Sequence, residues 1–218
     1  MRSDATTGPP VARPGGARHP VLPLFVLALL LAAAAAGVVL LLRPHLLFTN
    51  QLAAPVRLAV GAKAPRVIAP GEMVRIALRR GATTVAQWES IRPLSADSQP
   101  MGEVVRGATV LREPSGGVRL AASSRTAEAA WFAPLITNAT SHPLLVTVNA
   151  GLRGPLDCGC AVRPGRRRVF VGYYRLYLNS TVRARSPGVG AATFRDLGPK
   201  VTTSNGTVGL RFEDRDLR

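Results

Sequence analysis

Residues 21–42 read VLPLFVLALLLAAAAAGVVLLL, an apolar run that carries no charged side chain and is interrupted only by Pro23. At about 1.5 Å per residue, a helix of this length crosses a hydrocarbon core of roughly 30 Å. We therefore expect a single transmembrane helix over residues 21–43, with residues 21–42 in the lipid bilayer. Pro44 stops the helix just beyond it.

A cleaved signal peptide is the alternative interpretation of this run. The small residues 32–36 would supply a cleavage site, but cleavage there would leave the apolar residues 37–42 as the mature N-terminus. Signal peptides need an apolar region of only about 7–15 residues, so the length favours a retained anchor. A buried core helix is disfavoured because the run has no polar face.

Basic residues flank the run mainly on its N-terminal side. Arg2, Arg13 and Arg18 precede it with Asp4, whereas Arg43 alone follows it directly. Because basic residues favour the cytoplasmic side, we expect a cytoplasmic N-terminus and an extracytoplasmic C-terminal domain. That domain would be periplasmic, lumenal, or on a virion or cell surface. Residues 1–20, rich in Pro, Gly and Arg, are expected to form a disordered cytoplasmic tail.

The formal net charge is +16, and 26 of the 28 basic residues are arginine. A GC-rich coding genome explains such a bias and weakens any functional interpretation of single arginines. A surface this basic still attracts polyanions. The expected location disfavours nucleic acid as a partner. It leaves sulfated glycan or anionic lipid as alternatives, beside a solvated basic surface with no dedicated ligand.

Two segments downstream of the apolar run repeat one pattern. Residues 48–60 read FTNQLAAPVRLAV and residues 136–148 read ITNATSHPLLVTV, so that in each an Asn precedes a Pro by five residues and an alternating strand follows. Each copy continues to a Pro-Gly turn, at Pro70-Gly71 and at Pro164-Gly165. Short strands separated by such turns are typical of an Ig-like β-sandwich. We predict an all-β fold with two related units, 46–131 and 132–218, as two sandwiches or two halves of one.

Three segments invite local predictions. Residues 168–178 read as one strand that is apolar on both faces. Residues 94–117 read as a long loop of the kind that often binds, and residues 126–132 as a short helix joining the units. Trp131 and Phe132 are expected to pack between the units.

Cys158 and Cys160 are the only cysteines, which excludes a disulfide framework. Two thiols one residue apart can bind a soft metal such as Cu(I), or can form an easily reduced local disulfide. His142 is the histidine best placed to assist such a metal. A solvent-facing loop with two thiols or a local disulfide is the simpler interpretation.

With the anchor, the segment 138–165 resembles the copper-delivery assembly factors of cytochrome oxidase. It combines the Asn-to-Pro strand start, Cys-Gly-Cys and Pro-Gly. The resemblance implies Cu(I) bound by Cys158 and Cys160. Gly159 departs from it, because those factors carry an aromatic residue between the cysteines, and the spacing from Pro143 is shorter. We therefore do not assign the chain to that family.

Asn138, Asn179 and Asn205 each begin an Asn-x-Ser/Thr tripeptide, the acceptor pattern for N-glycosylation. Glycosylation at these sites would indicate a eukaryotic or viral protein of the secretory pathway. Turn chemistry alone is the alternative, because Asn followed by small polar residues favours turns.

Four arginines, Arg163, Arg166, Arg167 and Arg168, cluster around the second Pro-Gly turn. They are candidates for binding an anion or for recognition by a processing protease. Charged residues that protect a strand edge from aggregation are the alternative interpretation.

The sequence contains no Gly-x-Ser-x-Gly motif and no phosphate-binding glycine loop, so we expect no enzyme activity and no cofactor. It predicts a membrane-anchored binding or accessory protein whose extracytoplasmic sandwich docks a partner protein or membrane complex, such as an envelope or cell-surface glycoprotein would. Two alternatives stay open. One is a periplasmic copper or thiol-redox carrier using Cys158 and Cys160, and the other is attachment to sulfated glycan or anionic lipid through arginines.

Overall fold

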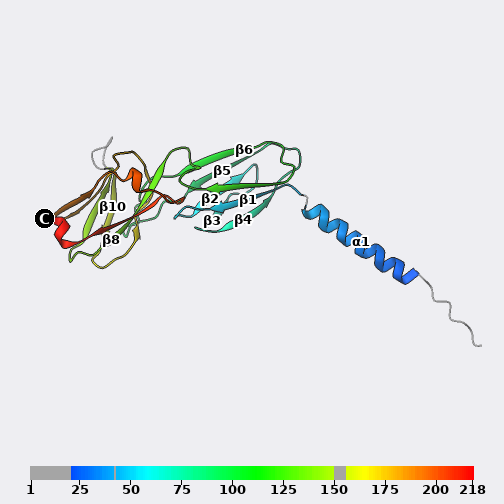
Figure 1. The fold of residues 1–218 in the computed structure, drawn as a ribbon, viewed down its shortest axis with the longest axis horizontal. Helices are drawn as coiled ribbons and strands as arrows, with labels where there is room; N and C mark the ends of the chain where they lie inside the picture. The colour runs from blue at the N-terminus through cyan, green and yellow to red at the C-terminus, as the bar shows by residue number, and fades with distance from the viewer. Residues whose placement is uncertain (1–20, 42, 150–155) are drawn as a thin grey trace, which may run out of the picture. The chain divides into compact units, whose positions relative to one another are not determined.

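The computed structural model describes residues 21–41, 43–149 and 156–218 (Figure 1), and the tail predicted over residues 1–20 lies outside them. By its internal contacts the chain divides into two units, Met1–Leu42 and Arg43–Arg218. We describe each by itself and call the second unit the body. The described part of the body is all β apart from two short 3-10 helices, η1 (Gly198–Lys200) and η2 (Asp214–Leu217). The prediction of an all-β fold is therefore confirmed.

Helix α1 (Val21–Leu41) forms in the apolar run. Its described side chains, at residues 25–35 and 37, include large apolar groups that are exposed, such as Phe25, Leu30 and Leu31. Across the described residues, no helix is both long enough and apolar enough to span a membrane.

The strands of the body form four sheets, two in each of two successive halves (Figure 1). In the first half, a three-stranded sheet has the order β4-β1-β7 and a four-stranded sheet has the order β3-β2-β5-β6. These strands are β1 (His45–Asn50), β2 (Val56–Val60), β3 (Arg66–Ile68), β4 (Met73–Ala77), β5 (Thr84–Ser90), β6 (Arg106–Leu111) and β7 (Gly117–Ala122).

The second half repeats this strand order. One sheet has the order β10-β9-β13-β14, and in the other β8 pairs with β11 and β12 on one side and with β15 on the other. The strands are β8 (Trp131–Asn138), β9 (Leu144–Val148), β10 (Leu156–Val162), β11 (Val169–Phe170), β12 (Tyr174–Arg175), β13 (Val182–Ser186), β14 (Gly190–Phe194) and β15 (Thr207–Phe212). In each half the first strand runs parallel to the last, β1 with β7 and β8 with β15.

Each half encloses its own apolar core, and strand β8 contributes to both. Trp131 and Ala133 belong to the first core, whereas Phe132 and Ile136 belong to the second. Successive side chains of a strand point to opposite faces, so one strand can serve two cores. The boundary predicted at residues 131 and 132 thus falls inside a strand that both halves share.

A buried asparagine ends the first strand of each half and explains the repeated Asn-to-Pro spacing. Asn138 Nδ2 donates hydrogen bonds to the carbonyl oxygens of His142 (2.8 Å) and Val162 (2.7 Å), and its Oδ1 accepts from Thr140 N–H. Its backbone N–H donates to Arg166 O and its carbonyl accepts from Gly165 N–H. The side chain is fully paired in a buried site, which is the condition for a stable buried amide.

Asn50 makes the same contacts in the first half. Its Nδ2 donates to Ala54 O (2.9 Å) and Ile68 O (3.0 Å), its Oδ1 accepts from Leu52 N–H, and its carbonyl accepts from Gly71 N–H. In each half, one asparagine therefore holds the loop after the first strand and the Pro-Gly turn in place, through its side chain and its backbone.

The prediction of one continuous strand over residues 168–178 is wrong. The segment forms the two short strands β11 and β12, because the chain passes close to another backbone between them. Gly172 has a φ of +101°, and a Cβ atom there would lie 2.8 Å from Met101 O. Leu178, predicted to be covered, is 86% exposed.

Two further local predictions are wrong. Residues 126–130 form turns and bends, and Trp131 begins β8 where a helix was expected. Glu128 N–H donates to Arg106 O, Ala130 O accepts from Leu176 N–H, and Trp131 and Phe132 pair with β12. These contacts override the helical propensity of the alanines. Residues 94–117 are not a continuous loop, because they contain β6, which pairs with β5 along its whole length.

Tyr173 joins the two halves of the body. Its hydroxyl donates to Asn205 O (2.8 Å) in the second half and accepts from Ala53 N–H (2.7 Å) in the first. Its carbonyl also accepts from Glu103 N–H (2.7 Å). Burial raises the pKa of Tyr173 to about 12, and the hydrogen bond from Ala53 lowers it by less. The phenol therefore stays protonated, and able to donate, over the physiological pH range.

Replacing Tyr173 with Phe is expected to lower the free energy of unfolding by about 1–3 kcal/mol, because Ala53 N–H and Asn205 O each lose a partner. The pKa of Tyr173 is higher in the folded than in the unfolded state. Its contribution is therefore complete below the unfolded value of 10.0 and is lost as pH rises through about 12. Urea unfolding across this range should show a decline in wild type that is smaller in Tyr173→Phe. Equal declines of the free energy of unfolding in the two proteins would contradict the raised pKa of Tyr173.

Replacing Asn138 or Asn50 with Ala is expected to lower the free energy of unfolding by about 3 kcal/mol each, because buried backbone groups lose their partners. The exposed Asn179 supplies the matched control, and Asn179→Ala should change the value by less than about 0.5 kcal/mol. Denaturant titration of the three variants measures this. Losses at Asn138 and Asn50 no larger than at Asn179 would show that the two buried amides are dispensable.

Candidate functional site

Cys158 and Cys160 lie on β10, an edge strand, and form a disulfide. Cys158 is buried in the second core and Cys160 is half-buried. The pairing of β10 with β9 shifts register between Asp157 and Ala161, so the disulfide occupies a bulge of the strand. Because both sulfurs are bonded to each other, neither is a thiolate, the form that binds metal.

No group of three or more His, Cys, Asp or Glu side chains gathers to hold a metal among the described residues. Binding of Cu(I) by the cysteines therefore remains a prediction for the reduced chain. His142 serves the fold through its backbone, whose carbonyl accepts from Asn138 Nδ2.

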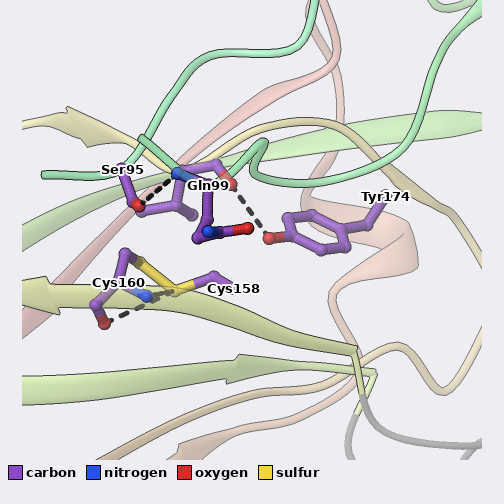
Figure 2. The surroundings of a disulfide bond; sticks show 6 residues. Ser95, Gln99, Cys158, Cys160 and Tyr174 are labelled. Atoms are coloured by element: carbon purple, nitrogen blue, oxygen red, sulfur yellow. Dashed lines mark hydrogen bonds between the residues drawn. A yellow bond between two sulfur atoms is a disulfide. The ribbon is translucent and has the colours of Figure 1, made fainter. Parts of the chain in front are cut away.

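A turn from the first half lies in the surroundings of this disulfide. Figure 2 shows Ser95 and Gln99 of the first half, and Tyr174 of the second, around Cys158 and Cys160. Ser95 Oγ accepts a hydrogen bond from Gln99 N–H (3.1 Å), and Ser95 N–H donates to Gln99 O (2.8 Å). The disulfide is thus placed where the two halves meet.

The three candidate glycosylation sites occupy different environments. Asn138 is 1% exposed and its Nδ2 is engaged, so a glycan on that atom is incompatible with the folded structure. Asn205 is half-buried and its Oδ1 accepts from the N–H and Oγ1 of Thr207, the turn arrangement that Asn138 makes with Thr140. Asn179 is exposed. Turn chemistry therefore explains the acceptor pattern at Asn138 and Asn205.

Arg163, Arg166, Arg167 and Arg168 are all exposed at the turn between β10 and β11. Their backbones hydrogen-bond within the fold: Arg166 N–H donates to Arg163 O, Arg166 O accepts from Asn138 N–H, and Arg168 N–H donates to Thr137 Oγ1. Within the described chain, no ion pair involves these four side chains. The structure places them together but adds no group that would select an anion.

The outer face of the β3-β2-β5-β6 sheet carries a shallow hollow of about 430 Å³. The small side chains of Ala59 and Ala108 flank Gln87 there, in direct cross-strand register. Gly107 on β6 is required, because a Cβ atom at this position would lie 2.5 Å from the buried ring of Trp88. The small residues leave a depression that larger side chains would fill.

Charged and apolar side chains border this hollow on opposite sides. Glu89 pairs with Arg57 (3.0 Å) and lies 3.8 Å from Arg106. The three side chains form a row of charges across the sheet. On the other side, Val85 and Val110 face each other across β5 and β6, and they are 39% and 54% exposed. An apolar patch beside a charged rim is the composition of a protein-binding surface.

The sequence does not reveal this outer face, because the loop it predicts over residues 94–117 includes the edge strand β6. The available signal was the alternation of Arg106, Ala108 and Val110 on one face of a strand. Gly107 and the surrounding Pro, Ser and Asp residues masked that signal.

A scan against protein-family models and a search of curated proteins found no match to this chain. Its function is therefore inferred from its own geometry.

Reducing the disulfide is expected to lower the free energy of unfolding by only about 1.6 kcal/mol, because it closes a loop of three residues. Urea unfolding with and without a reductant measures this, with the double variant Cys158→Ala/Cys160→Ala as the control that should not respond to reductant. A loss above about 4 kcal/mol would instead show that the disulfide stabilises the contact between the two halves.

Proposed function

We propose that this chain is a membrane-anchored, non-enzymatic docking protein. In this proposal residues 21–42 stay in the bilayer with the N-terminus in the cytoplasm, and the body displays an Ig-like pair of sandwiches outside it. The length and uniform apolar character of the run support the anchor.

The observation that carries docking is the outer face of the β3-β2-β5-β6 sheet. A partner side chain can fill the hollow over Ala59 and Ala108, and apolar groups can cover Val85 and Val110. Binding of this kind gains free energy from burial of apolar surface and from exclusion of water around a central pocket.

The charged row defines the chemistry of the partner. Arg57 and Arg106 flank Glu89, Glu128 also lines the hollow, and both arginine side chains are more than half exposed. A carboxylate from the partner can bind either guanidinium in a bidentate manner. We therefore propose a protein partner that presents an acidic side chain next to an apolar one.

Ala108→Arg is expected to reduce crosslinking to the partner about tenfold or more, because its side chain fills the hollow and adds a positive charge. The measurement uses full-length protein in its native membrane, with a photocrosslinking residue at position 87. Residue 87 lies beside Ala59 and Ala108 in the sheet.

Thr193→Arg is the matched control, because Thr193 is an exposed residue on β14, the equivalent edge strand of the second half. It should leave the crosslinked product unchanged. A product that forms equally in both variants, or no product from position 87 in wild type, would reject this face as the docking surface.

A further inference from the structure

Four parts of the chain meet at the end of the first half where the body begins. His45, the first residue of β1, pairs with Ala77 at the end of β4 and with Gly117 at the start of β7. Leu78 N–H donates to Pro44 O, and Gly61 N–H donates to Val85 O. The start of the body and the loops 61–65, 78–83 and 112–116 therefore lie at this same end.

Every one of these segments carries a positive charge. We call the set the basic end; its exposed cations are Arg43, Lys63, Arg79, Arg80 and Arg112. Glu113 is the only acidic residue in the four segments. Within the described chain, none of these five cations takes part in an ion pair.

The loops at the opposite end of the same half have the reverse balance. Segments 51–55, 69–72, 91–105 and 123–130 contain two cations, Arg92 and Arg125, and four carboxylates, Glu72, Asp97, Glu103 and Glu128. A genome-wide preference for arginine would enrich both ends alike. Within the first half, the charge of the loops is therefore distributed by position, with a net excess of positive charge at the end where the body begins.

A cavity at the basic end adds cations from the strands. It has a volume of about 460 Å³ and is lined by Lys63, Arg66 and Arg75 together with apolar residues of β2 and β4. Lys63 Nζ donates a hydrogen bond to Ala77 O, and Arg75 Nη2 lies 3.3 Å from His45 Nδ1. These two contacts place the Lys63 and Arg75 side chains at the cavity. Three cations that line one cavity without a carboxylate are suited to a phosphate group.

We propose that the basic end binds the phosphate groups of anionic phospholipids. This proposal rests on the proposed membrane anchor. Arg43 follows the apolar run directly in the sequence, so an anchored chain keeps these loops within reach of lipid head groups at high local concentration. Basic segments next to a membrane anchor are attracted to anionic lipid. Contact at the basic end would leave the outer sheet face free for a protein partner.

Lysine labelling tests this directly, because the chain contains only two lysines. Lys63 belongs to the basic end, whereas Lys200 is exposed on η1 in the second half. Full-length protein is placed in nanodiscs of phosphatidylcholine alone or of phosphatidylcholine with phosphatidylglycerol, and amine acetylation is followed by mass spectrometry. We expect the rate at Lys63 to fall about fivefold in the anionic discs and the rate at Lys200 to stay constant. Salt at roughly 0.5 M should restore labelling of Lys63.

Two double variants separate a specific site from general charge. Arg79→Ala/Arg80→Ala should abolish most of the protection of Lys63, whereas Arg166→Ala/Arg167→Ala removes the same charge from the second half and should preserve it. Equal labelling of Lys63 in both kinds of disc would overturn the inference. The inference would also be overturned if soluble heparin, added to neutral discs, protected Lys63 as well as anionic lipid does. The ligand would then be polyanions in general.

Failure of this inference and failure of the anchor give different results. If the chain elutes free of the discs, the anchor is wrong and the lipid contact falls with it. If the chain stays in the discs while Lys63 remains fully reactive, the anchor stands and only the lipid contact is rejected.

Discussion

A buried asparagine at the end of the first strand organises each half of the body. Asn50 and Asn138 satisfy two carbonyl groups and one amide that would otherwise be buried without partners. In doing so each fixes the loop after the strand against the following Pro-Gly turn. This constraint closes one end of each half, and the strand directions then place the remaining loops at the other end. In the first half those remaining loops are the cationic ones, which separates its positive charge from the end that Asn50 closes.

The two halves are joined by shared elements rather than by a linker. Strand β8 supplies alternate side chains to both cores, and Tyr173 hydrogen-bonds to backbone on either side. Gly102 and Gly172 let two backbones meet, since a Cβ atom on either would lie within 3.0 Å of the other segment's backbone. These contacts explain why residues 43–218 form one unit although the sequence repeats itself.

The repeat and the class of fold could be predicted from the sequence because they depend on local signals. The Asn-to-Pro spacing and the Pro-Gly turns are set by short-range backbone chemistry, and alternation sets the buried face. What could not be predicted depends on contacts between distant segments. The interruption of residues 168–178 is caused by Met101 and Gly102, about 70 positions away in the sequence. Strand β6 could not be predicted because it contains Gly107, which is required by contact with the Trp88 ring and weakens the strand signal. The docking hollow, which β6 borders, could therefore not be predicted either.

The proposed function combines a tether, a charged end and an open sheet face, and it depends first on the apolar run remaining in lipid. The most direct measurement is alkaline extraction of membranes from cells that express the full chain, followed by flotation and identification of the protein's first residue. The account predicts that the protein floats with the lipid and retains residues 21–42. Recovery of a soluble body that begins beyond Ala36 would contradict it.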